Sequence, residues 1–292
     1  MEGMTKQKLD CDAAAAEAGL TSLRLEELSQ VARAIADLGG SVLMQHYGQL
    51  VSIREKGRAG DLVTDADLAA EKAVLSGLGD ATPEIPVLAE ESGAQGDVSK
   101  LCWCVDPLDG TTNFAHGYPF FATSIGLLWR GLPILGAVAV PFLQEVFWCC
   151  PGAGSFLHDH RIKASGCSSL EDSLLVTGFA YDRRERVDNN YAEFCRLTHK
   201  TRGVRRGGAA AVDLAYVAAG RLDGYWERGL SPWDLTAGAA LVVIAGGQVS
   251  DYRAQNYDVS SGRILATGPG LHTALQRELE GIEPFAEQLY AD

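Results

Sequence analysis

The segment formed by residues 103–121, WCVDPLDGTTNFAHGYPFF, joins a strand-like run directly to two aspartates three positions apart. Residues 103–105 are bulky and favour a strand, whereas Pro107 lacks a backbone donor and interrupts the hydrogen-bond ladder of a sheet. We therefore expect the strand to end where the acids begin. The sequence predicts that Asp106 and Asp109 lie together on a turn at the end of a strand.

The chemistry of this turn suits a metal ion and a phosphate group. Asp106 and Asp109 offer the hard anionic oxygens that Mg²⁺ prefers, and Leu108 can turn its carbonyl toward the same centre. Gly110 allows close backbone approach, so that its amide and that of Thr111 can receive a phosphate. An ordinary acidic turn is the alternative, because Asp, Pro and Gly are also common turn residues. The longer string DPLDGTTNF favours the metal and phosphate site.

Three further segments accompany this motif: KGRAGDLVTDAD at residues 56–67, AEESG at 89–93 and SPWDLTAGAALVVIAGG at 231–247. With DPLDGTTNF and HGYPFF, in this order, they resemble the inositol monophosphatase superfamily of Mg²⁺-dependent, lithium-sensitive phosphatases. The resemblance covers about residues 25–270. It implies a layered α+β fold, an αβαβα sandwich of the inositol monophosphatase and fructose-1,6-bisphosphatase type. It also implies a metal site between the two halves, with about two or three Mg²⁺ ions.

Several acids have two readings when they are taken alone. Glu90 follows a predicted strand and suits either a solvated loop or a metal site. Asp234 stands three residues after Ser231, a spacing that by itself predicts a helix capping box. The resemblance instead implies that both acids bind metal and that Thr111 acts in catalysis. The implied metal ligands are Glu90, Asp106, the Leu108 carbonyl, Asp109 and Asp234.

Thr64 and Asp67 pose the same ambiguity, because T-x-x-D also opens a predicted helix. The resemblance implies that this segment supports the water network beside the metals. A nearby lysine can also offset repulsion between carboxylates. The residues expected in this supporting role are Lys56, Asp61, Thr64 and Asp67.

The other wall of the site is expected from the C-terminal part of the chain. By resemblance, Glu227 accepts hydrogen bonds from the sugar-alcohol ring of the substrate, although a surface acid is the alternative. Arg205 and Arg206 are typical solvated charges, but one of them can reach a second anionic group. The substrate-lining segment of the family matches Gly208, Ala209 and Ala210, with Gly110 and Thr111 on the phosphate side.

Periodicity predicts the remaining elements. Apolar residues recur at steps of three and four over residues 23–46, which predicts a helix, and a second helix should follow Thr64. Residues 121–129, 133–140 and 145–150 are β-favouring runs separated by turns, typical of a meander. Further helices are expected over 211–219, 232–245 and 271–279, and strands over 85–88, 222–226, 248–252 and 264–266.

Composition limits the partners. With 292 residues, 47% of them hydrophobic, the chain can bury a substantial core. We expect a flexible N-terminal leader over residues 1–22 and a single phosphatase domain over 23–292, whose N-terminal half ends at about residue 160. A net charge of −13 disfavours nucleic acid as a partner. Seven scattered cysteines indicate reduced thiols in the cytoplasm, and no segment has the roughly 20 apolar residues of a membrane span.

These observations predict a phosphate monoester hydrolase that uses metal-activated water, with inositol 1-phosphate as the leading substrate. A homodimer is expected by resemblance. Alternatives on the same fold are fructose-1,6-bisphosphatase and other sugar, polyol or histidinol phosphatases. A different class also stays open, namely a regulatory or RNA-associated protein that retains a phosphatase site.

Overall fold

The computed structural model of the protein describes residues 9–57, 61–252 and 257–285. The helices within these residues are α1 (Cys11–Glu17), α2 (Ser22–His46), α3 (Asp65–Ala81), α4 (Thr111–Ala115), α5 (Tyr191–Lys200), α6 (Ala210–Ala218), α7 (Pro232–Ile244) and α8 (His272–Glu280). The strands are β1 (Ile53–Glu55), β2 (Leu62–Thr64), β3 (Val87–Ala89), β4 (Gly93–Gln95), β5 (Leu101–Asp109), β6 (Ala122–Trp129), β7 (Leu132–Val140), β8 (Glu145–Cys150), β9 (Gly154–Leu157), β10 (His160–Ile162), β11 (Leu174–Thr177), β12 (Gly203–Arg205), β13 (Gly224–Arg228), β14 (Gln248–Ser250) and β15 (Arg263–Thr267).

Most of these strands form two sheets. The larger sheet has the order β10-β9-β8-β7-β6-β5-β3-β4, and the smaller one has the order β12-β11-β13-β15-β14. In the larger sheet the strands from β5 to β10 pair antiparallel in chain order, and the predicted meander forms β6 to β8 of this run. On the other side of β5, β3 pairs with it in parallel and with β4 antiparallel. A separate hairpin of β1 and β2 lies against α4.

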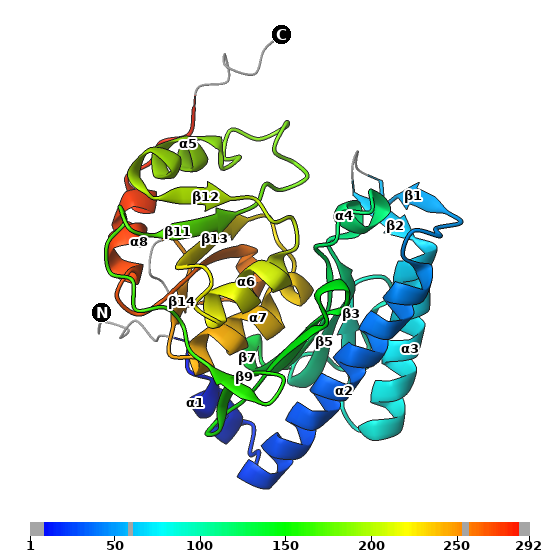
Figure 1. The fold of residues 1–292 in the computed structure, drawn as a ribbon. Coiled ribbons are helices and arrows are strands. Elements are labelled where there is room, and N and C mark those ends of the chain that lie inside the picture. Colours follow the sequence, from blue (N-terminus) through cyan, green and yellow to red (C-terminus); the bar gives the residue numbers. More distant parts are fainter. Residues whose placement is uncertain (1–8, 58–60, 253–256, 286–292) are drawn as a thin grey trace.

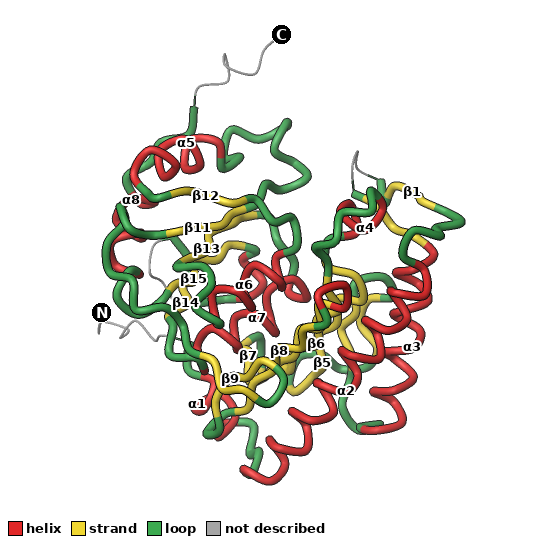
Figure 2. The backbone as a smooth tube through the Cα atoms, in the orientation of Figure 1, coloured by secondary structure: helices red, strands yellow, loops and turns green. Residues whose placement is uncertain are grey.

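The helices divide into layers around these sheets (Figures 1 and 2). Helices α2 and α3 pack on one face of the larger sheet, and α7 packs on its other face against β6 and β7. Helices α6 and α7 lie between the two sheets, while α5 and α8 contact the smaller sheet from its outer side (Figure 1). This order of layers confirms the predicted αβαβα sandwich.

Two glycines allow α7 to lie directly on the larger sheet. Gly126 of β6 and Gly136 of β7 are register partners on neighbouring strands. A Cβ on Gly126 would come within 2.4 Å of the Thr236 Cγ2, and one on Gly136 within 2.4 Å of the Ala237 Cα. Real Cβ atoms do not approach other atoms so closely, so the two positions keep the first turns of α7 against the strands.

The structure corrects the expectation at the N-terminus. Residues 1–8 lie outside the described part of the chain, but residues 11–17 form α1, which contacts β7 and α7. Cys11, Ala14 and Ala15 are buried in the main core. The prediction of a flexible leader over residues 1–22 is therefore wrong for this segment, because small apolar side chains fill space beside the sheet.

Most of the predicted helices and strands are present in the structure, but some elements of the structure were not predicted. The predicted helices over 23–46, 211–219, 232–245 and 271–279 and the three meander strands are confirmed within one or two residues, whereas β11 and α5 were not expected. All seven cysteines are free, which confirms the expected thiols.

Within the described residues, every helix is too short or too polar to cross a membrane. The division into halves at about residue 160 stays a prediction.

Candidate active site

A bulge at the end of β5 brings the two aspartates of the central motif to the same side. Asp106 is opposite Ser124 and Asp109 is opposite Ala122, so three steps on β5 match two steps on β6. Residues three apart on a regular strand point to opposite faces, and the extra residue removes this difference. The strand therefore continues to Asp109, and the expectation that it ends before the acids is wrong. Pro107 is tolerated because it falls at the bulge, where its missing donor is not needed.

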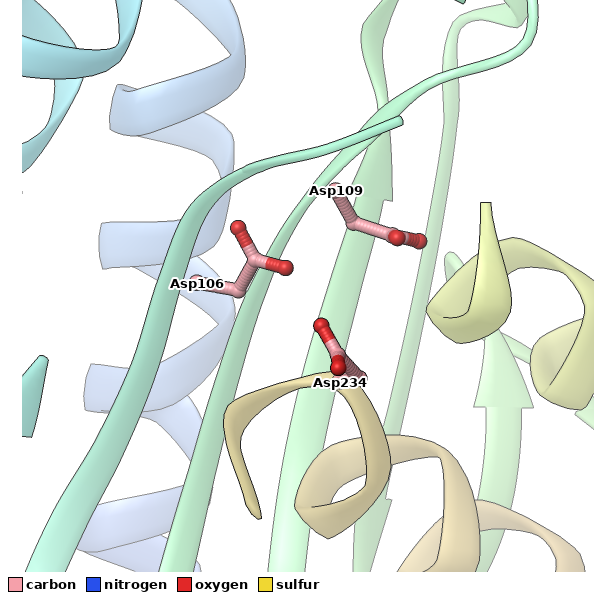
Figure 3. Close-up of side chains that lie close together, drawn as sticks. All are labelled: Asp106, Asp109 and Asp234. Carbon is pink, nitrogen blue, oxygen red and sulfur yellow. The ribbon is translucent and has the colours of Figure 1, made fainter. Parts of the chain in front are cut away.

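Asp234 completes a cluster of three acids. Carboxylate oxygens of Asp106, Asp109 and Asp234 all lie within 4.8 Å of one another. Figure 3 shows the three side chains converging, the first two from β5 and the third from the start of α7. Asp106 and Asp109 are buried, and Asp234 is partly exposed. This geometry suits a divalent cation, because a bound positive charge offsets the repulsion between carboxylates that lie so close together.

Two members of the cluster, Asp109 and Asp234, accept hydrogen bonds from backbone N–H groups at the start of a helix. The Asp109 carboxylate accepts hydrogen bonds from the backbone N–H groups of Ala210 (3.1 Å) and Ala211 (2.8 Å), in the first turn of α6. Asp234 accepts one from the backbone N–H of Ser231 (2.7 Å), at the start of α7. Unpaired N–H groups at a helix N-terminus favour negative charge. The three-residue spacing that predicts a helix cap at Asp234 and the proximity that suits a metal are thus both present.

The pKa values of the three acids reflect burial and crowding. Burial, followed by the charges of Glu90 and Asp109, raises the pKa values of both Asp106 and Asp234 well above the usual range. Burial also raises the pKa of Asp109 to about 7, although hydrogen bonds from Ala211 and Ala210 oppose the shift. Carboxylates in this state gain most from a bound cation, which compensates both effects.

Glu90 lies outside this group of three and has a lysine partner. The Lys56 Nζ donates to the Glu90 carboxylate (2.7 Å) and to that of Glu91. Burial alone would lower the pKa of Lys56, but the charge of Glu90 and these hydrogen bonds raise it. The Lys56 backbone N–H donates to the Asp61 carbonyl (2.7 Å), which closes the loop after β1. The lysine thus sits beside the acids that it was expected to neutralise.

Thr64, Asp67 and Thr111 form a buried chain of hydrogen bonds. Asp67 Oδ2 accepts from the backbone N–H of Thr64 (2.8 Å) and from its hydroxyl (2.6 Å). The Thr111 hydroxyl lies 3.1 Å from Asp67 Oδ1 and 3.0 Å from the Leu108 carbonyl. It has one proton, so these two acceptors share it. Asp67 therefore caps α3 and also orients Thr111.

A cavity of about 440 Å³ joins these groups to the C-terminal wall. Thr64 and Asp67 are absent from its lining, and Asp67 accepts a hydrogen bond from the lining residue Thr111. Of the residues singled out from the sequence, the lining includes Lys56, Asp61, Glu90, Asp106, Leu108, Asp109, Gly110, Thr111, Gly208, Ala209, Ala210, Glu227 and Asp234.

Glu227 of β13 is the acid on that wall. It is 8% exposed, its Oε2 accepts a hydrogen bond from the Tyr225 hydroxyl (2.6 Å), and burial raises its pKa to about 7. A Cβ on Gly178 would lie 2.0 Å from Glu227 Oε2, so the glycine leaves room for the carboxylate. Gly110 and Gly208 have φ angles of 90° and 84°, which glycine adopts without strain.

A second group of lining residues, in the loop after β11, was not predicted from the sequence. Gly178, Phe179, Ala180, Tyr181 and Arg183 line the cavity. An ion pair fixes this loop, because Arg228 donates to both oxygens of Asp182 (2.8 and 3.0 Å). The one sequence signal for this loop is FAYDRRER at residues 179–186, in which two aromatic residues are followed by clustered charges.

Comparisons with known proteins first place the fold in a class. A solved inositol monophosphatase from Anabaena (Nostoc) superimposes with a TM-score of 0.83 and is 47% identical, covering 89% of this chain and 98% of that one. Such agreement over nearly the whole length of both chains puts the αβαβα sandwich among the inositol monophosphatase folds.

Sequence comparison then gives the family. The profile of the inositol monophosphatase family matches residues 24–283. An inositol-1-monophosphatase from Synechocystis is 51% identical over 86% of this chain and 88% of its own length. The Nus factor SuhB from Pseudomonas aeruginosa is 42% identical over 83% and 92%, respectively. The chain belongs to the inositol monophosphatase family, as its motifs predict.

Proposed function

We propose that this protein is a Mg²⁺-dependent phosphatase that hydrolyses inositol 1-phosphate to inositol and phosphate. The observation that carries the proposal is the convergence of Asp106, Asp109 and Asp234, with oxygens within 4.8 Å, in a cavity that Glu227 also lines. One wall thus suits cations and a phosphate, and the other suits a polyol. A volume of about 440 Å³ lies within the range of pockets for small ligands.

The donor set fits Mg²⁺, since it consists of hard oxygens on crowded carboxylates. Asp106, Asp109 and Asp234 would hold one ion, and Glu90 with Asp106 and the Leu108 carbonyl would hold another. When bound, the ions supply Lewis-acid chemistry, which acidifies water and stabilises charge on a leaving oxygen. Lys56 offsets repulsion around Glu90 through the hydrogen bond already described.

The residues of the chain then have separate tasks. Asp67 and the Leu108 carbonyl hold the hydroxyl of Thr111 in place, which lets that oxygen orient the attacking water. Gly110, at the start of α4, leaves room for a phosphate close to the backbone. Water attacks phosphorus as the bond to the alcohol oxygen breaks, so no covalent enzyme intermediate is required.

Glu227 has the task of recognition. The Tyr225 hydroxyl occupies its Oε2, which leaves Oε1 to accept hydrogen bonds from substrate hydroxyls. Ala210 and Gly208 line the cavity beside it. Inhibition by Li⁺, a homodimer and a cytoplasmic location belong to the same proposal, and the free cysteines support a reducing compartment.

The experiment that tests the substrate compares two phosphate esters in Glu227→Gln. Hydrogen bonds to a charged group contribute roughly 1.5–3 kcal/mol, so kcat/KM for inositol 1-phosphate should fall by about one to two decades. Hydrolysis of a flat aryl phosphate, which offers no hydroxyls, should change little. An equal loss for both esters would assign Glu227 to the catalytic machinery. No loss for either would remove inositol phosphate as the substrate.

The SuhB relatives support a second candidate, a regulatory role in which the phosphatase site is retained. Those relatives carry the name Nus factor, and one of them is 42% identical to this chain. The net charge of −13 argues against direct contact with a nucleic-acid backbone. Retention of RNA on a filter, measured beside phosphate release, separates the two roles.

A further inference from the structure

Residues 178–190 connect β11 to α5 as one long loop that contains neither helix nor strand. Asn190 closes the neck of this loop, because its Nδ2 donates to the Thr177 hydroxyl and to the Gly178 carbonyl, both at 2.7 Å. Asn190 is buried, and its Oδ1 accepts a hydrogen bond from the indole N–H of Trp226 (2.7 Å). Loops whose two ends are joined in this way are compact and frequently functional.

Ion pairs to the smaller sheet hold the middle of the 178–190 loop. Arg228 of β13 is buried and binds both oxygens of Asp182, and its Nε lies 3.8 Å from an oxygen of Asp188. Arg263 of β15 also donates to Asp188. A guanidinium that binds a carboxylate through two parallel hydrogen bonds fixes the orientation of the pair as well as its distance. The loop therefore has one defined position relative to β13.

This position places Tyr181 at the rim of the cavity, where it is a lining residue and is 44% exposed. Thr112 of α4 lines the same cavity. Partial burial raises the pKa of Tyr181 to about 12, a hydrogen bond from the Thr112 side chain opposes this shift, and the charges of nearby acids add to it. Because α4 directly follows β5 of the larger sheet, the contact between Tyr181 and Thr112 joins elements of the two sheets across the cavity (Figure 1).

We propose that Tyr181 is a positioning residue that closes the mouth of the cavity against Thr112, and that the ion pair between Asp182 and Arg228 holds the loop in this closed position. The inference rests on the proposed function of the same cavity. Closure keeps a phosphate ester and its phosphate product in the cavity, and the mouth opens to release them. Since Asn190 holds the neck, opening requires the loss of the ion pair but no refolding of the loop.

Two substitutions test the closure, and each has a matched control. Y181F removes the hydroxyl and keeps the ring, whereas D182N removes the charge from the ion pair. Y118F removes a hydroxyl from a tyrosine that is 53% exposed and does not line the cavity. D172N breaks an exposed ion pair with Arg202 (2.7 Å). Thermal unfolding of each variant shows whether the fold survives, and Y181F decides the inference by itself if D182N does not fold.

Trypsin reports the opening of the loop, because the loop itself carries Arg183, Arg184 and Arg186. Cleavage after these three residues is followed by mass spectrometry, with and without Mg²⁺ and inorganic phosphate as the probe. In the wild-type protein the probe should slow this cleavage. In Y181F and D182N we expect faster cleavage without the probe, and we expect the protection by the probe to be lost. Y118F and D172N should behave as the wild-type protein does.

Steady-state kinetics separate closure from chemistry. The KM for inositol 1-phosphate and the inhibition constant of inorganic phosphate should both rise, by about fivefold in Y181F, which loses a neutral hydrogen bond, and by about tenfold in D182N, which loses a charged one. The kcat should stay within about twofold of the wild-type value, because closure holds substrate and transition state equally. All constants of Y118F and D172N should also change by less than about twofold.

Three results would overturn the closure. Trypsin would cleave the loop equally fast in Y181F and Y118F, D172N would raise KM as much as D182N, or Y181F would lower kcat without changing KM. Failure of the proposed function looks different. In that case cleavage of the loop would still respond to Y181F and D182N, but the wild-type protein would release no phosphate from inositol 1-phosphate.

Discussion

Helices α3 and α7 begin with the same sequence pattern and use its acid differently. In each, an aspartate at the third position accepts a hydrogen bond from the backbone N–H of the capping residue, at 2.8 Å for Asp67 and 2.7 Å for Asp234. Asp67 is fully buried, and the hydroxyls of Thr64 and Thr111 complete its hydrogen bonds. Asp234 instead faces two other carboxylates in the cavity.

The difference teaches that a capping motif fixes where a helix begins but leaves the other carboxylate oxygen uncommitted. The groups that the fold places beside this second oxygen then decide the role of the aspartate. Burial raises the pKa of Asp67, and the hydrogen bonds from the hydroxyl and backbone N–H of Thr64 oppose this shift. Asp234 meets like charges, which add to burial and raise its pKa further. Only the second environment calls for a cation.

The largest expected effect is that of removing the cation altogether. Exhaustive treatment with EDTA should abolish phosphate release, and added Mg²⁺ should restore it, because the crowded acids cannot position a phosphate alone. Mg²⁺ should also raise the Tm of the wild-type protein by mass action. Full activity after chelation would contradict the metal mechanism for the whole cavity.

The second-largest effect is expected for Asp234→Asn, whose kcat should fall by about 10³-fold, equivalent to ~4 kcal/mol of transition-state stabilisation. The amide can still accept the hydrogen bond from Ser231, so the helix cap and the fold should survive. The rise of Tm with Mg²⁺ should disappear. Near-normal turnover at saturating Mg²⁺ would show that Asp234 is not a metal ligand. The proposed difference in role between Asp234 and Asp67 would then be wrong.

Asp67→Asn should have a smaller effect on activity, about 10- to 100-fold, since this acid acts by orienting Thr111 rather than by holding the ion. The variant should keep the rise of Tm with Mg²⁺ that Asp234→Asn loses. Circular dichroism in a Mg²⁺ titration measures this difference. If both variants lost the metal response, the two helix starts would be equivalent after all.

The smallest effect concerns pH in the metal-free protein. A carboxylate whose pKa is raised on folding stabilises the protein fully below its unfolded pKa, and that stability is lost as pH rises through the folded pKa. The unfolded value is about 4, and the folded value of Asp109 is about 7. In EDTA the Tm should therefore fall by a few degrees across this range. Asp234→Asn should flatten the slope more than Asp67→Asn, and equal slopes would contradict the comparison.

Much of this site is readable from the sequence, because its acids lie in short motifs attached to periodic elements. The sequence motifs identify Asp106, Asp109 and Asp234 as metal ligands, and the fold brings their carboxylates together. The bulge that aligns the first two was missed, since it depends on the pairing of β5 with β6. The sequence of one strand does not specify the register in which that strand pairs with its neighbour.

The loop after β11 shows the same limit on a larger scale. Its position depends on the ion pair between Asp182 and Arg228, which are 46 residues apart in the chain. The hydrogen bond from Lys56 to Glu90 spans 34 residues. Local propensity and spacing do not encode such pairs. Tyr181 and Arg183 could therefore be assigned to the cavity only after the fold was known.

The glycine pair beneath α7 extends the site beyond the residues that touch it. Gly126 and Gly136 leave no room for a methyl group, since either Cβ would meet α7 at 2.4 Å. A side chain there would lift the helix and carry Asp234 away from its two partners. Such a variant would keep every ligand and yet require a higher concentration of magnesium to reach half-maximal rate. A mutation at either glycine would therefore raise the magnesium concentration that the cell needs, although neither glycine is a metal ligand.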